Sequence, residues 1–269
     1  MRILIVNTVY KRGGAASIAQ TLHRELNRLE GWESLFAYGR GPKTKEPGTI
    51  RFALPPEVYL HVALTRLTGL QGYGTWLSTK RLIRLIREWK PDVIHFHNIH
   101  DYYLNLGIAK AVDRIGIPVV WTLHDAWSLS GRCGYFLDCG RWKTGCGRCP
   151  YPSEYPKTYF DSSAWMWPRK RKLLGEVWKP VIVTPSKWLA ALVTEACNGR
   201  CDVKVILPGK ALLAQKPTTF VFIMYSGILF AILLTPFRLD SFLEKVSRGG
   251  VMNSKHLLDP RCDVRDVQP

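Results

Sequence analysis

Short apolar runs that alternate with stretches of helical period constrain the fold of this 269-residue chain more than any other feature. The first run, Ile3 to Val6, is followed by a glycine pair and then by apolar residues at three- and four-residue spacing: Ile18, Leu22, Leu26 and Leu29. Strands buried on both faces give continuous apolar runs, and the helices that cover them give apolar stripes. The alternation therefore predicts an α/β fold, a Rossmann-like parallel sheet flanked by helices.

The same alternation continues to about residue 207. Further strands are predicted at 34–39, 92–97, 117–125, 180–186 and 202–207, and further helices at 82–89, 104–112, 169–178 and 187–196, with one more between 40 and 74. Ser186 is placed to cap the last of these helices. We therefore predict one Rossmann-like domain over residues 1–207, and the chain contains no obvious internal repeat.

The pattern is lost over residues 208–269, which we predict to be an irregular, apolar carboxy-terminal tail. Within it, segment 217–237 carries no charged residue and is long enough to span a bilayer. Gly227 and Pro236 argue against a single helix there. A membrane or membrane-surface segment, a buried hairpin and an out-of-frame translation are the interpretations left open.

The formal charge of +17 predicts an anionic partner, which could be nucleotide phosphates, nucleic acid, an acidic glycan or an anionic membrane surface. Residues 210–269 carry only +3 of this charge, from eight Lys and Arg against five Asp and Glu, so the basic character belongs to the predicted domain. The run Arg169 to Lys172 lies near Trp165, Trp167 and Trp178. It could contact nucleic acid, dock on anionic lipid headgroups or be the solvated face of a helix.

The cysteines raise the question of redox state and metal binding. The first apolar run is too short for an export signal and is soon followed by Lys11 and Arg12, so we expect a cytoplasmic protein whose cysteines are thiols or metal ligands. Four of them, in a cysteine-rich loop over 130–152, have the spacing C-x5-C-x6-C-x2-C: Cys133, Cys139, Cys146 and Cys149. Structural zinc, reduced thiols and disulfides all remain open. A catalytic zinc is not expected, because four thiolates leave no open position for a substrate.

Two groups of residues follow predicted strands and could bind a ligand. Gly13 and Gly14 lie between the first strand and a helix, where backbone amides and the helix dipole favour a phosphate or a sugar hydroxyl. The GxGxxG spacing of a dinucleotide site is missing, which argues against a nicotinamide enzyme. His124 and Asp125 follow the strand at 117–125, at the sheet edge where ligands bind in open α/β folds.

Three further histidines lie close to one another in the sequence. His95 and His97 alternate on one face of their strand, and His100 follows in the loop. They could form hydrogen bonds in a substrate pocket, bind a metal or be structural. Because no cysteine or carboxylate other than Asp101 lies at ligand spacing, we favour the substrate pocket over a metal.

Five ordered segments resemble the amino-terminal half of glycosyltransferase family 4, and most closely its members that build bacterial exopolysaccharide, capsule or lipopolysaccharide. They are "ILIVNTVYKRGGAASIAQTLHREL", "PDVIHFHNIHDYYLN", "IPVVWTLHDAWSLSGRCGYF", "KTGCGRCP" and "VTPSKWLA". The resemblance implies the GT-B fold, in which two Rossmann-like domains flank the active site. It makes residues 1–207 the acceptor-side domain, and it implies retaining transfer of a sugar from a nucleotide-sugar donor to a glycan or lipid-linked acceptor.

The resemblance also implies roles for the candidate residues. His124 would hydrogen-bond the transferred sugar and help stabilise the oxocarbenium-like transition state, and Asp125 would hold the His124 imidazole in one tautomer or contact the acceptor. The chemistry would need no metal, since protein dipoles and basic side chains neutralise the departing nucleotide diphosphate.

The family's donor-binding half is not recognisable after residue 207. Where the family has "PNG" and later two glutamates about eight residues apart, this chain reads "VILPGKALLAQKP", and Glu244 is its only glutamate beyond residue 210. The sequence thus predicts a truncated glycosyltransferase of bacterial polysaccharide biosynthesis, weakly active or inactive alone, in the cytoplasm or at the inner face of the membrane. The alternatives are a zinc-knuckle nucleic-acid-binding module and a membrane-anchored, non-catalytic scaffold; the α/β alternation argues against nucleic acid as a partner.

Overall fold

A computed structural model describes residues 1–207 of the chain. These residues form one seven-stranded sheet in the order β3-β2-β1-β4-β5-β6-β7, and every neighbouring pair is parallel. The strands are β1 (Arg2–Val9), β2 (Glu33–Arg40), β3 (Thr49–Arg51), β4 (Val93–Phe96), β5 (Val119–Thr122), β6 (Val181–Thr184) and β7 (Val203–Val205). The predicted Rossmann-like parallel sheet is confirmed.

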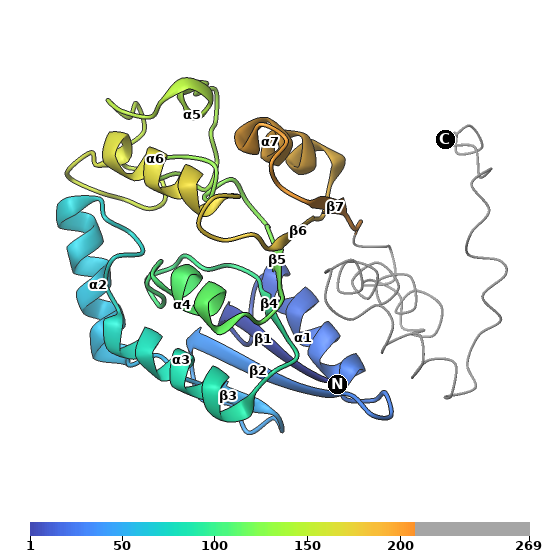
Figure 1. Ribbon diagram of the computed structural model, residues 1–269. Coiled ribbons are helices and arrows are strands. Elements are labelled where there is room, and N and C mark those ends of the chain that lie inside the picture. Colours follow the sequence, from blue (N-terminus) through green and yellow to red (C-terminus); the bar gives the residue numbers. More distant parts are fainter. Residues whose placement is uncertain (208–269) are drawn as a thin grey trace, which may run out of the picture. The chain divides into compact units, whose positions relative to one another are not determined.

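Helices connect the strands (Figure 1). They are α1 (Gly14–Leu26), α2 (Pro55–Thr68), α3 (Trp76–Trp89), α4 (Ile108–Ile115), α5 (Arg141–Thr144), α6 (Ser163–Leu173) and α7 (Lys187–Cys197). Two apolar cores lie on the two faces of the sheet: α1 packs in the smaller one, and α3, α4 and α7 pack in the larger one. Helices therefore cover both faces, which explains why most strands are buried on both sides.

Three elements differ from the sequence prediction. β3 was not predicted, because its three residues are only partly buried or exposed and give no apolar run. α4 begins at Ile108 rather than residue 104. α6 spans Ser163–Leu173 rather than 169–178, and it contains Pro168, a residue that normally breaks a helix interior and therefore hid the first part of this helix.

The segments that follow β1, β4 and β5 begin at the same edge of the sheet. β1 lies between β2 and β4; the strand order runs outward from β1 through β2 to β3 and then continues with β4 on the other side of β1, so it switches between β1 and β4. In open parallel sheets ligands bind outside the carboxyl ends of the strands at such a switch point. The segments that follow β1, β4 and β5 are thus the ones to search for a site.

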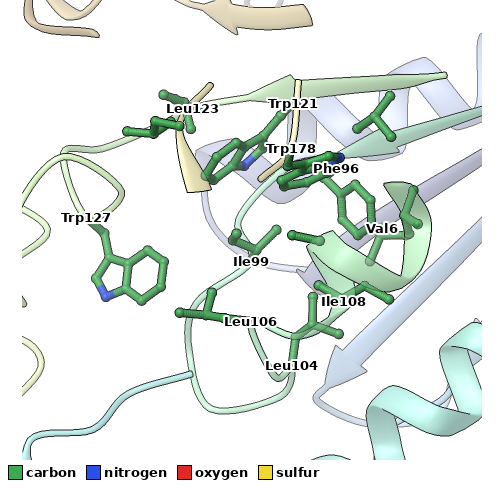
Figure 2. Packing of buried hydrophobic residues seen from close by; sticks show 14 of the residues in the cluster. Val6, Phe96, Ile99, Leu104, Leu106, Ile108, Trp121, Leu123, Trp127 and Trp178 are labelled. Carbon is green, nitrogen blue, oxygen red and sulfur yellow. The ribbon is translucent and has the colours of Figure 1, made fainter. Parts of the chain in front are cut away.

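An aromatic cluster anchors the carboxyl ends of β4 and β5 (Figure 2). Trp178 packs edge-to-face on Phe96 at 5.4 Å and stacks on Trp121 at 5.3 Å between ring centroids. The indole of Trp121 also donates a hydrogen bond of 2.9 Å to the backbone carbonyl of His97. This buried cluster fixes the position from which the chain leaves β4.

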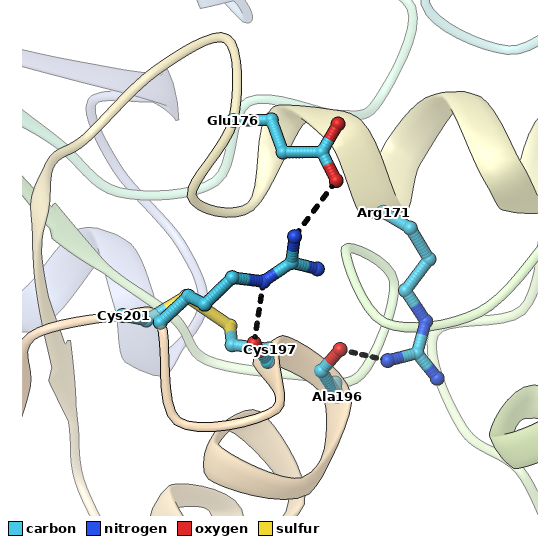
Figure 3. The surroundings of a disulfide bond; sticks show 6 residues. Arg171, Glu176, Ala196, Cys197 and Cys201 are labelled. Carbon is cyan, nitrogen blue, oxygen red and sulfur yellow. Dashed lines mark hydrogen bonds and ion pairs between the residues drawn. A yellow bond between two sulfur atoms is a disulfide. The ribbon is translucent and has the colours of Figure 1, made fainter.

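A disulfide joins Cys197 to Cys201 just after α7 (Figure 3). The expectation that all cysteines are thiols or metal ligands is wrong for this pair. Asn198 is in the left-handed conformation and ends the helix, and the two Cα atoms lie 5.8 Å apart. Next to the disulfide, Arg200 donates to the carbonyl of Cys197 and forms an ion pair with Glu176.

The predicted tail over 208–269, including its apolar segment 217–237, lies outside the described residues. Among residues 1–207, no helix is both long enough and apolar enough to cross a membrane.

Gly39 provides a test of the packing between β2 and the segment after β4. A methyl group at this position would lie 2.1 Å from Cδ2 of Tyr103, a fully buried side chain. We expect Gly39→Ala to lower the free energy of unfolding in urea by about 1–3 kcal/mol, the usual cost of overpacking. Gly140→Ala is the control, since Gly140 has φ −84° and no heavy atom within 4 Å of an added methyl group. Equal effects of the two substitutions would contradict the described packing.

Candidate active site

A column of three imidazole rings stands at the carboxyl ends of β4 and β5. His97 Nδ1 lies 2.9 Å from His124 Nε2, and the two rings stack with centroids 5.2 Å apart. His95 stacks on the other side of His97 at 4.3 Å, and its Nε2 lies 2.8 Å from Thr122 Oγ1. The alternation of side chains along parallel neighbouring strands puts all four side chains on the same face of the sheet.

Burial keeps these imidazoles neutral at pH 7. It lowers the pKa of His95 to about 3 and that of His97 well below its ordinary value. Burial also lowers the pKa of His124 to about 4, although the nearby charge of Asp125 opposes this shift. In the neutral pair His97–His124, one ring nitrogen donates the hydrogen bond and the other accepts it.

His124 is the member of the column that reaches solvent. Its ring is partly exposed, whereas His95 and His97 are 1% and 0% exposed. Nε2 of His124 is hydrogen-bonded to His97, and among the described residues no protein group hydrogen-bonds Nδ1 of His124. A ligand at the sheet edge can therefore form a hydrogen bond with this second nitrogen.

Asp125 points to a different histidine. Its Oδ2 lies 2.8 Å from His100 Nε2, and its Oδ1 accepts a 2.9 Å hydrogen bond from the backbone amide of Trp127. The interpretation that Asp125 holds the His124 imidazole in one tautomer is therefore wrong in this structure. His97 has that orienting role, because it is the only described side chain hydrogen-bonded to His124.

His100 and Asp125 form a buried ion pair. Although burial disfavours the charged imidazole, the negative charge of Asp125 and hydrogen bonds to Asp101 and Asp125 raise the pKa of His100 to about 9. Burial opposes ionisation of Asp125 as well, but the charge of His100 lowers the pKa of this carboxyl below its usual value. His100 Nδ1 lies 3.2 Å from the hydroxyl of Tyr155, which also donates to Asp101. The pair thus links the loops after β4 and β5 to the segment before α6.

Backbone strain marks the same edge of the sheet. Arg12, Asp101 and Tyr102 have φ values of 79°, 74° and 67°, which cost a non-glycine residue about 1–3 kcal/mol each unless the surroundings enforce them. Arg12 follows β1, and the other two follow β4. Such strain is typical of binding and catalytic loops.

The predicted glycine turn is open to ligands. Gly13 and Gly14 are exposed, no heavy atom lies within 4 Å of a methyl group built on either residue, and Gly13 has a φ of +88°. α1 begins at Gly14 and has no acidic residue in its first turn. The free amides at this helix end can donate hydrogen bonds to an anionic or hydroxyl group.

A basic pocket of about 470 Å³ adjoins this turn at the carboxyl ends of β1 and β2. Four cationic side chains line it: Lys11, Arg40, Lys43 and Lys45. Glu46, its one acidic residue, is paired with Arg24 at 3.2 Å, and no carboxylate within residues 1–207 pairs with the three lysines. The sequence analysis did not single out this pocket, for which the cations of "GRGPKTKEP" are the only signal.

The four clustered cysteines do not form a metal-binding group in the described part of the chain. All four are free, and no three His, Cys, Asp or Glu side chains in the described part of the chain are grouped to hold a metal. The sulfur of Cys146 accepts a hydrogen bond from the amide of Gly131, and that of Cys149 lies 3.5 Å from Arg132. The predicted zinc site of Cys133, Cys139, Cys146 and Cys149 is not formed in this arrangement.

Arg132 braces the cysteine-rich loop instead. Its guanidinium is 4% exposed and donates to four backbone carbonyls, those of Tyr151, Pro152, Glu154 and Pro156. A planar cation with several donors satisfies carbonyl groups that would otherwise be buried without partners. In this structure an arginine, rather than a metal held by the cysteines, ties these carbonyl groups together.

The run Arg169 to Lys172 is not a continuous basic surface. Lys170 is 1% exposed; its ammonium group lies 2.5 Å from the carbonyl of Trp127 and 3.9 Å from the centre of the Trp127 ring. Burial lowers the pKa of Lys170 to about 7. Arg171 donates to backbone carbonyls, so only Arg169 and Lys172 are exposed. The nucleic-acid, lipid and solvated-face interpretations of this run therefore depend on Arg169 and Lys172.

The structure therefore separates the predicted site residues into two groups. Gly13 and Gly14 are exposed, and His124 and Asp125 are partly exposed. The predicted substrate contacts of His95, His97 and His100 are not available here, because the three rings are buried behind the first group. The sequence analysis did not identify three side chains that support the candidate site: Thr122, Tyr155 and Lys170. Asp101 also supports it, and this residue did have a signal in the sequence, its position beside His100.

A parallel Rossmann-like sheet with a strained, partly exposed polar edge at its switch point is typical of α/β proteins that bind nucleotides or sugars. The sequence profile of Glycosyltransferase Family 4 matches residues 12–209, so the chain belongs to this family.

Individual proteins give further similarities. The chain is 32% identical over 236 residues to the putative colanic acid biosynthesis glycosyl transferase WcaC of Escherichia coli K12, a match that covers 81% of this chain and 58% of that protein. The chain thus spans little more than half of that relative. Two solved UDP-N-acetylglucosamine 2-epimerases, from Rickettsia bellii and from Neisseria meningitidis with bound UDP-GlcNAc, are each 11% identical, with TM-scores of 0.41 and 0.40. The matches cover 91% and 93% of this chain and 50% and 53% of those chains.

The ion pair of His100 predicts a pH dependence of stability. The pKa of His100 is about 9 in the folded state and about 6.5 unfolded, so its stabilisation is complete below about pH 6.5 and is lost as the pH rises through 9. We expect the difference in unfolding free energy between the parent and His100→Gln to shrink by about 3 kcal/mol between pH 6 and pH 9.5, measured by urea titration.

The comparison with His100→Gln is needed because Lys170 titrates in the opposite sense. Its folded pKa lies below its unfolded value, so the destabilisation from burying its charge disappears as the pH rises. Lys170 is present in both proteins, and its effect largely cancels in the difference. A difference that stays constant from pH 6 to pH 9.5 would show that His100 is not charged in the folded protein.

Proposed function

We propose that residues 1–207 form the acceptor-side wall of a sugar-transfer site. The reaction is transfer of a sugar from a nucleotide sugar to a glycan or lipid-linked acceptor in bacterial surface-polysaccharide synthesis. The observation that carries this proposal is the neutral His124, which His97 holds in place and whose Nδ1 remains without a protein partner among the described residues. Membership of Glycosyltransferase Family 4 supports the reaction class.

In this proposal His124 forms a hydrogen bond with the sugar that is transferred. The oxocarbenium-like transition state of glycosyl transfer carries positive charge on the sugar ring. A protonated imidazole beside that ring would repel the charge, whereas a neutral one can donate or accept a hydrogen bond without this penalty. The pKa of about 4 therefore suits His124 to positioning and hydrogen bonding rather than to proton transfer.

We assign to the cations beside the glycine turn the role of binding the anionic part of a substrate. The turn at Gly13 and Gly14 offers free amides at the start of α1, and the basic pocket next to it has three lysines without carboxylate partners in the described part of the chain. A phosphate or diphosphate group would satisfy both features. No metal ion is needed for this role.

The proposed reaction also requires a donor-binding wall. The chain spans 58% of the relative from E. coli, and no described residue supplies that wall. We therefore assign residues 1–207 to the acceptor side and expect the 269-residue chain alone to transfer sugar very slowly or not at all.

Saturation-transfer NMR tests the role of His124. Nucleotide sugars and neutral oligosaccharides are mixed in turn with the 269-residue chain, and we expect saturation to reach sugar-ring protons more strongly than nucleobase protons. His124→Ala should weaken the sugar signal about fivefold, because one hydrogen bond contributes roughly 1 kcal/mol.

Arg28→Ala is the control for this measurement, since Arg28 follows α1 at the opposite edge of the sheet and is exposed. It should leave the sugar signal unchanged. If no sugar in the panel receives saturation, or if His124→Ala and Arg28→Ala behave alike, the proposed sugar site is wrong.

Inorganic pyrophosphate tests the basic pocket. Replacing both Lys43 and Lys45 by Ala should weaken its binding about tenfold in isothermal titration calorimetry, since two exposed charge pairs together contribute roughly 1–1.5 kcal/mol. Raising the salt concentration should weaken binding to the parent protein more than to this variant. Lys110→Ala with Lys172→Ala, which removes the same charge elsewhere, should have little effect. Equal affinities of the two double variants would refute a specific anion pocket.

A further inference from the structure

Helix α2 presents an apolar face to solvent. Its exposed residues are Pro55, Pro56, Tyr59, Leu60, Ala63, Arg66 and Leu67, and Arg66 is the one charged residue among them. The buried face of the same helix carries Val58, His61 and Thr65. A surface helix of a globular domain normally has the reverse arrangement, with polar residues outside. The outer face of α2 is therefore built for contact with something apolar.

The start of α3 continues this face. Glu57 of α2 accepts hydrogen bonds of 2.7 Å from the backbone amides of Leu77 and Ser78, so the first turn of α3 is fixed to the first turn of α2. Trp76 and Leu77, at this junction, are 61% and 58% exposed. Since Glu57 caps α3, the negative charge nearest to these side chains is already engaged.

The segment before α6 extends the face at the other end of α2. The amide of Tyr159 donates a 2.7 Å hydrogen bond to the carbonyl of Arg66, and Ser162 donates to the carbonyl of Thr68. Tyr159 and Phe160 are 69% and 65% exposed. Three segments far apart in the sequence thus form one exposed apolar surface, which we call the α2 face: Tyr59, Leu60, Leu67, Trp76, Leu77, Tyr159 and Phe160. Figure 1 shows α2 with α3 and α6 as its neighbours.

Cations surround the α2 face. Arg66 lies within it, Lys80 and Arg81 follow Trp76 and Leu77 by one turn on the exposed side of α3, and Lys157 precedes Tyr159. Within residues 1–207, none of these four cations has a carboxylate partner. Asp161, the nearby acid, accepts hydrogen bonds from the amides of Cys149 and Ser163.

We propose that the α2 face docks on the surface of a bilayer that contains anionic lipids. Tryptophan and tyrosine favour the region between headgroups and acyl chains, leucine and phenylalanine favour its apolar side, and lysine and arginine favour anionic headgroups. The α2 face and its rim contain all three kinds of residue. A second copy of the chain fits less well, because a two-fold contact would bring the same unpaired cations against one another.

The α2 face is one connection away from the candidate active site. Gln71, three residues after α2, donates a 3.2 Å hydrogen bond to the hydroxyl of Tyr155, which contacts His100. If the chain handles a lipid-linked acceptor, as the proposed function states, docking on this face brings the site close to the membrane surface. Docking itself does not depend on that function, since it follows from exposed side chains alone.

Vesicle flotation tests the α2 face with the full 269-residue chain. Vesicles of phosphatidylcholine alone are compared with vesicles that also contain phosphatidylglycerol, and we expect binding to be at least about tenfold stronger with the anionic lipid. Replacing Tyr59, Leu60 and Trp76 together by Ser should reduce binding more than about tenfold, because three interfacial anchors are lost. Tyr135→Ser with Leu137→Ser, two side chains that are 71% and 62% exposed in the cysteine-rich loop, should bind like the parent.

A charge variant separates membrane docking from misfolding. Arg66→Glu with Arg81→Glu leaves the apolar side chains in place, and it should abolish the preference for anionic vesicles while the urea unfolding curve stays unchanged. The Ser variant should keep the sugar signal in saturation-transfer NMR, so a failure of docking and a failure of the proposed function give different results.

Two outcomes would overturn the inference. Equal flotation of the Ser variant and the parent would mean that another part of the chain binds the membrane. A concentration-dependent dimer in analytical ultracentrifugation that the Ser variant abolishes, together with no vesicle binding by the parent, would assign the α2 face to a second copy of the chain.

Discussion

The buried ion pair between His100 and Asp125 is the interaction on which the geometry of the site depends. It joins the loop after β4 to the loop after β5, and Tyr155 extends it to the segment before α6. Burying two charges costs several kcal/mol each, and breaking such a pair is destabilising because one charge is left uncompensated. The pair therefore acts as a clamp: the strained backbone at Asp101 is tolerated because this carboxylate, too, contacts His100.

The clamp and the imidazole column have different electrostatic roles. The clamp is charged, whereas burial keeps His95, His97 and His124 neutral a few ångströms away. Lys170 supports the position of Asp125: its ammonium group donates a hydrogen bond to the carbonyl of Trp127, and the amide of Trp127 donates one to Asp125. Adjacent histidines on one sheet edge thus have opposite protonation states, and the environment of each ring decides which one it has.

The sequence was sufficient for the sheet, the glycine turn and the edge on which the candidate site lies, because these depend on local apolar period and on parallel topology. It was not sufficient to predict which side chains pair with one another. Asp125 adjoins His124 in the chain but pairs with His100, since consecutive residues leaving a strand point in opposite directions. The disulfide of Cys197 and Cys201 depends on a reversal at Asn198, and the apolar outer side of α2 is invisible without knowing which side is buried.

The guanidinium of Arg132 has a consequence for how the cysteine-rich loop responds to its surroundings. Four carbonyl oxygens converge on a cation, much as they do around a coordinated ion, but here the cation is covalently part of the loop. Such a centre has no dissociation constant, so chelating agents cannot remove it and metal scarcity in the cell cannot empty it.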